Sequence, residues 1–174
     1  MTMKKYNVAL TPQTNINAFD ALVSEANPYT NGYCVGYKSI PHITICQFFL
    51  DSSLIENIWH KICTQINQTS LNISFSSYSN FTFDNNTYWL SLLPNNPEYL
   101  FNLFKIVSSY VTSIRTDDYD PHLTLFNYTK KNHDLIQKFL APNIFIKTKF
   151  ELTLSICDEL GQIKQISLYN GHHS

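Results

Sequence analysis

Two five-residue stretches of the sequence carry residue types that could do acid–base chemistry. Residues 41–45 read Pro-His-Ile-Thr-Ile and residues 121–125 read Pro-His-Leu-Thr-Leu, eighty positions apart. Successive side chains of a β-strand point to opposite faces, so His42 would share a face with Thr44, and His122 with Thr124. A face that twice repeats an imidazole and a hydroxyl is unusual for a protein core. The two stretches therefore predict a functional site.

Paired histidines suit proton transfer because the ordinary pKa of an imidazole, about 6.5, lies close to neutrality. One neutral ring can act as general base and one charged ring as general acid, and each transfer typically contributes about 10²–10⁴-fold. This suits an in-line displacement at phosphorus, with Thr44 and Thr124 donating to phosphate oxygens. We expect His42 and His122 to be catalytic, with no metal and no cofactor. The near-symmetry of the motifs leaves open which histidine is the acid.

The alternative is that both stretches are ordinary strands whose histidines and threonines merely face solvent. One such string would leave that alternative open, but two copies in a chain of 174 residues are much harder to obtain by chance. The other histidines, His60, His133, His172 and His173, are expected on the surface. The acidic residues near the second motif, at 117, 118 and 120, lie on an expected loop and do not form a carboxylate cage for a metal.

The elements that must position the motifs follow from hydrophobic periodicity. Alternation predicts strands at 6–10, 39–50, 71–75, 121–128, 144–157 and 163–169, with a hairpin around 84–86. Apolar residues at helical spacing predict helices at 16–23, 54–66, 97–111 and 132–140. Ser53 and Glu56 fit a capping box at the start of the second helix.

Each half of the chain thus runs strand, helix, motif strand, helix, strand. An internal repeat of this kind predicts two lobes related by a pseudo-two-fold axis. We expect an α+β fold over residues 1–174 as a single domain. Its two pseudo-symmetric lobes would each have an antiparallel sheet and outer helices, with one His-x-Thr strand per lobe facing a central cleft.

Composition limits the classes of partner. The formal net charge is −1 and only 14% of residues are charged, so no long basic track for duplex nucleic acid is expected. The four cysteines show no zinc-type spacing and suggest free thiols in a reducing compartment. No signal-like or membrane-spanning apolar run is apparent. We expect a cytoplasmic monomer that binds a small or terminal ligand and no membrane.

The doubled motif resembles the signature of the 2H phosphoesterase superfamily. That superfamily includes 2′,3′-cyclic nucleotide phosphodiesterases, the bacterial "2′-5′ RNA ligase" proteins and 2′,5′-oligoadenylate-cleaving enzymes. The resemblance covers nearly the whole chain and implies a bilobal α+β fold and a metal-free mechanism. It implies His42 and His122 as acid and base, and Thr44 and Thr124 as phosphate ligands. The implied reaction is cleavage at the ribose 2′ position of a 2′,3′-cyclic phosphate or a 2′,5′-linked or cyclic oligonucleotide, with a small nucleotide or RNA terminus as substrate.

One feature departs from the family pattern. Many bacterial RNA-ligase-like members carry an arginine soon after the second motif (His-x-Thr-Leu-x-Arg), whereas residues 126–128 here are Phe-Asn-Tyr. Tyr128 has the strand parity of His122 and could instead stack on a nucleobase, although a packed core tyrosine is equally consistent. A nucleotide-binding module with little turnover stays an alternative to an enzyme. An RNA-binding accessory protein is the less favoured alternative because the net charge is near zero.

Overall fold

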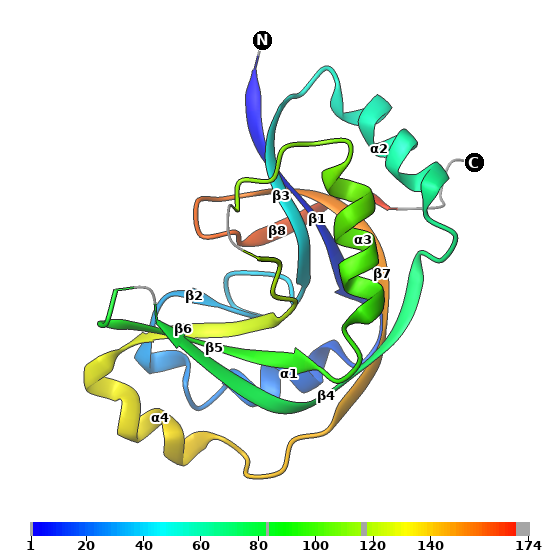
Figure 1. Ribbon diagram of the computed structural model, residues 1–174. Helices are drawn as coiled ribbons and strands as arrows, with labels where there is room; N and C mark the ends of the chain where they lie inside the picture. The colour runs from blue at the N-terminus through cyan, green and yellow to red at the C-terminus, as the bar shows by residue number, and fades with distance from the viewer. Residues whose placement is uncertain (1, 83, 116–117, 170–174) are drawn as a thin grey trace.

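The computed structural model describes residues 2–82, 84–115 and 118–169 (Figure 1). The strands are β1 (Met3–Pro12), β2 (Thr30–Cys34), β3 (Ile43–Asp51), β4 (Ser70–Thr82), β5 (Thr87–Pro94), β6 (Leu123–Thr129), β7 (Ile146–Cys157) and β8 (Ile163–Tyr169). The α-helices are α1 (Ile16–Val23), α2 (Ile55–Gln65), α3 (Glu98–Ser108) and α4 (His133–Phe139), and short 3₁₀ helices span Asn27–Tyr29 and Lys130–Asn132. The predicted α+β class with an antiparallel sheet is confirmed.

The start of α2 differs from the prediction. The helix begins at Ile55, and the residue at its N-cap position, Leu54, makes no side-chain capping bond. Ser53 instead donates from its backbone N and its Oγ to Asp51 Oδ1, at 2.9 and 2.8 Å. The charged carboxylate of Asp51 is a strong acceptor for both Ser53 donors, and the capping box predicted for Ser53 and Glu56 is replaced by this turn.

All eight strands belong to one antiparallel sheet that closes on itself. On one side, β1 lies between β3 and β7, and β8 pairs with β7. On the other, β5 lies between β6 and β4, and β2 pairs with β6. β4 pairs with β7, and β3 meets β6 through a single residue pair, Ile43 opposite Leu123. Six strands therefore form a ring, β1-β3-β6-β5-β4-β7 and back to β1 (Figure 1).

The strand order repeats the internal symmetry of the sequence. The set β3-β1-β7 corresponds to the set β6-β5-β4, so each half of the chain contributes one strand to the other half's set. The helices follow the same rule, because α1 contacts β6 and α3 contacts β3. In Figure 1, α3 lies beside β3 with α2 next to it, whereas α1 and α4 lie on the side of the molecule that holds β6, β5 and β4. This exchange of elements is consistent with the predicted pseudo-two-fold relation.

Each motif strand contains a β-bulge directly after its threonine. Ile45 in β3 and Leu125 in β6 each stand between two residues that pair with consecutive partners on the neighbouring strand. An extra residue of this kind reverses the alternation of side chains beyond it. Before the bulge, even-numbered residues share the face of the motif histidine and threonine. After the bulge, odd-numbered residues lie on that face.

The core contains a cluster of aromatic rings contributed by both halves of the chain. Phe19 of α1, Phe75 of β4 and Phe150 of β7 are fully buried. Their ring centroids lie 6.0–6.3 Å apart in edge-on arrangements, which suits the quadrupoles of the rings. This cluster holds α1 against the point where β4 and β7 pair.

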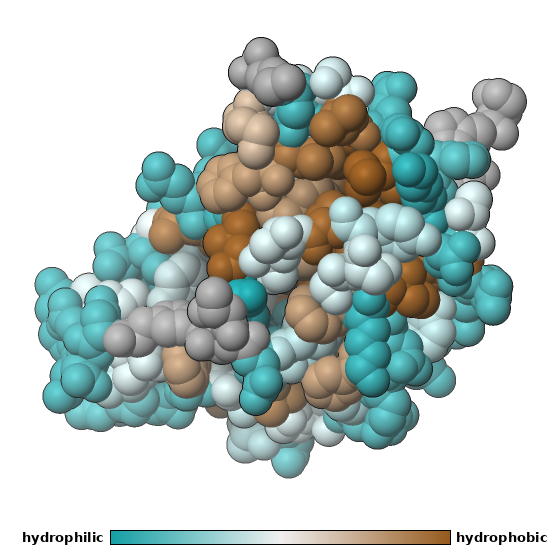
Figure 2. Space-filling view, turned by 45° about the horizontal axis from the view of Figure 1, so that its top comes forward, coloured by the Kyte–Doolittle hydropathy of each residue, from teal (hydrophilic) through white to brown (hydrophobic). Residues whose placement is uncertain are grey.

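Apolar side chains also reach the surface. Figure 2 shows them gathered in the upper half of the face in view, whereas the lower half is mainly hydrophilic. Large exposed hydrophobic residues include Phe49 on β3, Leu54 before α2 and Phe101 on α3. Over the residues described above, no helix has both the length and the apolar character needed to cross a membrane.

Candidate active site

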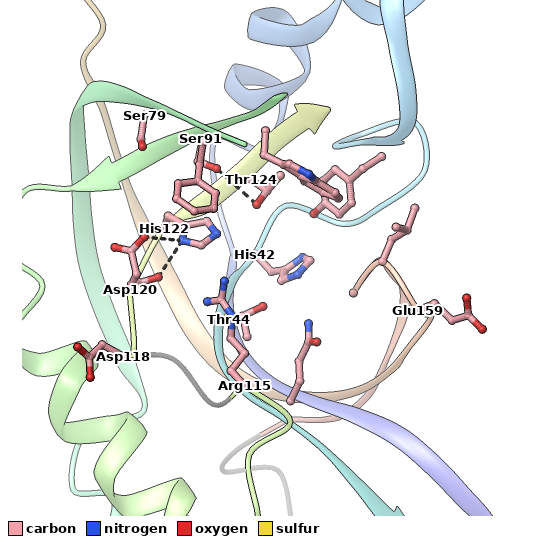
Figure 3. A pocket seen from close by; sticks show the side chains of 16 residues that line it. His42, Thr44, Ser79, Ser91, Arg115, Asp118, Asp120, His122, Thr124 and Glu159 are labelled. Carbon is pink, nitrogen blue, oxygen red and sulfur yellow. Dashed lines mark hydrogen bonds and ion pairs between the residues drawn. The ribbon is translucent and has the colours of Figure 1, made fainter. Parts of the chain in front are cut away.

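A pocket of about 470 Å³ lies where β3 and β6 meet, and residues of both motifs line it (Figure 3). The lining side chains come from β2, the two motif strands, β4, β5, the segment before β6 and the β7–β8 turn. They are Tyr33, His42, Thr44, Gln47, Ser79, Phe81, Trp89, Ser91, Arg115, Asp118, Asp120, His122, Thr124, Glu159, Leu160 and Gly161. The structure thus brings the four motif residues predicted from the sequence into one pocket.

The histidines sit at the junction of the two strand sets. Each motif strand begins one residue after its histidine, because the preceding proline has no N–H to give to a ladder. Ile43 and Leu123, the first residues of β3 and β6, form the only pair between these strands in the part of the chain that the structure describes. That pair holds His42 and His122 beside each other (Figure 3).

The same backbone hydrogen bond orients both imidazoles. His42 Nδ1 lies 2.7 Å from the carbonyl oxygen of Ile40, and His122 Nδ1 lies 2.8 Å from that of Asp120. A carbonyl oxygen only accepts, so Nδ1 carries a proton and donates in each ring. Nε2 of each ring is therefore the atom available for proton exchange with a ligand.

The two imidazoles differ in their surroundings. His42 is 5% exposed, and burial lowers its pKa to about 4, with the charge of His122 adding to the effect. The backbone groups of Ile40 and Gly161 favour the charged ring and so oppose this shift of the pKa without cancelling it. His42 is consequently neutral at physiological pH, which is the state that a general base requires.

A carboxylate accompanies only the second histidine. Asp120 Oδ2 lies 3.6 Å from His122 Nδ1, and the His122 side chain is 25% exposed. His122 is the main reason that the pKa of the Asp120 carboxyl is below its usual value, and Arg115 adds to the effect. Asp120 is therefore ionised at neutral pH beside the ring of His122.

The two threonines are held by matching contacts. Asn7 of β1 donates from Nδ2 to Thr44 Oγ1 at 3.1 Å, and Ser91 of β5 donates from Oγ to Thr124 Oγ1 at 3.5 Å. A hydroxyl that accepts from its neighbour keeps its own proton for another acceptor. Both threonines can therefore donate to an anionic oxygen in the pocket, as phosphate binding requires.

Solved structures with this arrangement of elements identify the fold. E. coli LigT in apo form matches with a TM-score of 0.64 at 12% identity, over 97% of this chain and 96% of that chain. Kluyveromyces marxianus Usb1 with uridine monophosphate matches with a TM-score of 0.54 at 12% identity, over 94% and 96%. A structure described as a phosphoesterase gives 0.60 at 11% identity, over 90% of each chain. The chain has the LigT fold.

Sequence comparison alone does not reach this result, because no family model and no curated protein matches the sequence. The agreement with LigT extends over almost the whole length of both chains. At identities of 10–12%, what the solved structures share with this chain is the fold.

Within this LigT fold, the pocket holds a basic residue that the sequence reasoning missed. Arg115 lines the pocket from the segment between α3 and β6. It is the only arginine of the chain and stands seven residues before His122. A lone arginine so near a phosphate-type motif was the signal that could have found it, since a guanidinium matches phosphate oxygens well. A basic side chain thus reaches the pocket from a position before the second motif.

The structure does not bring Tyr128 into the pocket, which corrects the prediction of a nucleobase-stacking role. Tyr128 is fully buried and stacks on Tyr88, with ring centroids 5.6 Å apart. Its hydroxyl donates to Asn80 Oδ1 at 3.0 Å and lies 3.1 Å from His133 Nδ1. The bulge at Leu125 is the reason, because it turns the later even-numbered residues of β6 away from the pocket face.

The first motif strand behaves in the same way. Beyond its bulge, Gln47 lines the pocket, whereas Cys46 and Phe48 are buried on the opposite side. Aromatic residues reach the pocket from other strands: Tyr33 and Trp89 pack with ring centroids 5.8 Å apart, and both line it.

Metal-ligating side chains do not cluster in the described part of the chain. No group of three or more histidine, cysteine, aspartate or glutamate residues is placed to hold a metal ion there. Asp118 and Asp120 line the pocket, and Asp117 lies outside the described residues, as do His172 and His173.

Proposed function

We propose that the protein is a metal-independent phosphodiesterase of the 2H type that acts at the ribose 2′ position. The observation that carries the proposal is the pair of imidazoles in one pocket, each with Nδ1 committed to a backbone carbonyl and Nε2 available. A binding protein has no need of two rings prepared in this way. The substrate would be a 2′,3′-cyclic phosphate or a 2′,5′-linked or cyclic oligonucleotide.

The proposed reaction is an in-line displacement at phosphorus. A new bond forms between phosphorus and the attacking water, and the ester bond to a ribose oxygen breaks. One imidazole accepts the proton of the water through Nε2, and the other donates its Nε2 proton to the departing oxygen. Thr44 and Thr124 donate to the non-bridging oxygens, where negative charge builds up in the transition state.

The pocket supports a nucleotide or an RNA end as the substrate. A volume of about 470 Å³ is of the size found for small-molecule sites. Arg115 supplies positive charge for a phosphate, and Trp89 and Phe81 supply aromatic surface for a base. Structures of LigT with 3′-AMP, ATP and NADP+, and of Usb1 with uridine monophosphate, point to the same class of ligand. The net charge of −1 argues against duplex nucleic acid, and we expect a monomer in the cytoplasm.

Phosphorus NMR provides the most direct test. The purified protein, with a chelator present, is incubated with 2′,3′-cyclic, 2′,5′-linked and 3′,5′-cyclic substrates, and the products are identified by their chemical shifts. We expect turnover of at least one 2′-type substrate and none of the 3′,5′-cyclic one. Tight binding of a mononucleotide without product over long incubation would instead favour a nucleotide-binding module.

Replacing either histidine tests the paired mechanism. His42→Ala and His122→Ala should each lower kcat by about 10²–10⁴-fold on the confirmed substrate, because each removes one proton transfer. His60→Ala, on an exposed position of α2, is the matched control and should keep full activity. Thermal melting of each variant separates loss of chemistry from loss of fold. Near-normal activity in a folded His122→Ala variant would rule the mechanism out.

A further inference from the structure

The two motifs differ at the position two residues before each histidine. Ile40 precedes the first proline and Asp120 precedes the second. The backbone carbonyl of each residue accepts a hydrogen bond from Nδ1 of the histidine that follows it. Only Asp120 adds a side chain to that contact, with its carboxylate 3.6 Å from His122 Nδ1 (Figure 3). The site is therefore symmetric in geometry and asymmetric in charge.

We propose that Asp120 is a positioning residue that keeps His122 protonated, so that His122 is the general acid and His42 the general base. The inference rests on the proposed function, because it assigns roles within that reaction. Asp120 itself would touch neither the substrate nor the reacting atoms. It would act through the ring of His122.

None of the charged groups that line the pocket forms an ion pair with His42 in the described part of the chain. They come from the segment before β6 and from the β7–β8 turn, and they are Arg115, Asp118, Asp120, Glu159 and His122. Within the described residues, the ion pair of Asp120 with His122 is the only one that involves either motif histidine. His42 is 5% exposed, so a charge on its ring would be poorly solvated.

The proximity of the two rings strengthens this division. Two imidazolium groups in one pocket repel each other, so one proton shared between the two rings goes to the ring that is better stabilised. His122 has the carboxylate and the greater exposure to water. His42 has a buried position and the positive charge of His122 as its neighbour.

The assignment gives the reaction a direction across the pocket. Water would attack phosphorus from the His42 side, and its proton would pass to His42 Nε2. The departing ribose oxygen would leave on the His122 side and take the proton of His122 Nε2. The charge on His122 would be lost as the ester bond breaks, and exchange of protons with solvent would restore both rings.

Histidine titration by NMR tests the role of Asp120 without reference to activity. Asp120→Asn keeps the shape and the backbone carbonyl and removes only the charge, and the side chain is 74% exposed, so the fold should survive. Because the carboxylate lies 3.6 Å from His122 Nδ1, we expect its loss to make the charged His122 ring less favourable at low ionic strength, which the titration would show as a move to lower pH. High salt should shrink this difference, because the pair is partly solvated. Asp118→Asn, which removes a charge from the same pocket, should move the midpoint less.

The pH profile should follow the titration. The alkaline limb of kcat should move to lower pH in Asp120→Asn, as the titration does, whereas the acid limb, which reports His42, should keep its position. Asp120→Glu should restore part of the shift. An unchanged His122 midpoint in Asp120→Asn would overturn the inference even if activity fell, since the loss would then be structural.

A change of leaving group tests which histidine is the acid. A 4-nitrophenyl phosphodiester has a leaving group that needs no proton, so His122→Ala should lose at least about tenfold less activity on it than on the ribose substrate. His42→Ala should be impaired on both. The reverse pattern would overturn the assignment. Absence of turnover on every substrate would contradict the proposed function, whereas the NMR titration would still decide whether Asp120 acts on His122.

Discussion

At the scale of single residues, the threonines depend on neighbours outside the motifs. Asn7 donates to Thr44 and Ser91 donates to Thr124, so each hydroxyl is left with a proton and a fixed direction for it. These neighbours lie on β1 and β5, the strands that flank β3 and β6. Each motif supplies a threonine hydroxyl, and a side chain on the adjacent strand orients the proton of that hydroxyl.

Thr124→Val tests the donor role. Valine keeps the branched shape and removes the hydroxyl, so we expect kcat on the confirmed substrate to fall by about 10²-fold, as for loss of one transition-state donor. Thr124→Ser keeps the hydroxyl and should retain most of the activity. Thr64→Val, on an exposed position of α2, is the control for valine in place of threonine. Equal activities of the Val and Ser variants at position 124 would show that the hydroxyl does not contact the substrate.

The sequence predicted pocket residues only where residue types that can transfer protons or bind phosphate recur in a short motif. His42, His122, Thr44 and Thr124 share a pocket because two short motifs repeat. The proposed assignment of acid and base was not predictable from the motifs, because it depends on the burial of one ring and on a carboxylate that precedes the other motif.

At the scale of elements, the segment from α3 to β6 is fastened to the first motif strand. Ile114 donates from its backbone N to the carbonyl of Gln47 at 2.8 Å, and Tyr119 donates from its hydroxyl to the carbonyl of Thr44 at 3.0 Å. The Tyr119 ring also stacks on Phe104 of α3, with centroids 4.6 Å apart. The segment that carries the pocket's charged groups is thus positioned by the opposite motif.

Tyr119→Phe removes one of these fastenings. We expect a loss of about 1 kcal/mol in the free energy of unfolding, because a carbonyl loses its partner, and a rise in KM as the segment with Arg115 loosens. Tyr99→Phe is the matched control: the Tyr99 hydroxyl donates to the carbonyl of Gln68 at 2.6 Å, outside the pocket. It should show a similar loss of stability in urea unfolding with unchanged kinetics. Equal kinetic effects in both variants would mean that the segment is not held by Tyr119.

Helices and strands were predictable because long runs of apolar residues repeat with the period of one or the other. The face of the sheet on which a side chain lies was not predictable beyond a bulge. The helix at 16–23 and the terminal hairpin follow their apolar patterns closely. Strand alternation gives Tyr128 the face of His122 and gives no reason to place Gln47 in the pocket, because the extra residue after each threonine breaks the two-residue period. Two consecutive apolar residues after the motif fit a buried strand equally well, so the sequence offers no separate signal for the bulge.

At the scale of the whole molecule, the buried imidazole of His42 makes the free energy of unfolding depend on pH. Burial lowers the pKa of His42 to about 4, whereas an unfolded chain exposes an imidazole with a pKa of about 6.5. Between these values the unfolded chain binds a proton that the folded protein does not. Stability from this group is therefore complete above pH 6.5 and falls as the pH drops toward 4, by about 3 kcal/mol in total.

His42→Gln should remove this dependence. We expect the wild type to lose stability in urea between pH 7 and pH 4.5, and the variant to lose clearly less over the same interval. His60→Gln, at an exposed position, should behave as the wild type. The carboxyls with a lowered pKa, such as Asp51 and Asp84, are the same in the wild type and the variant, so their contribution cancels in the comparison. Parallel pH curves for wild type and His42→Gln would contradict the buried neutral imidazole.

The closed ring of strands bears on how the chain comes to fold during synthesis on the ribosome. β1 is made before the other seven strands, yet one of its two edges pairs with β7, so that Tyr6 lies opposite Ile156. Contacts this far apart in sequence form late, because closing the long loop between them has to come first. The nascent chain therefore carries β1 with an open edge until residues beyond 150 have emerged. A chain that ends after the second motif would contain both histidines but lack β7, so the ring of strands that brings them into one pocket could not close.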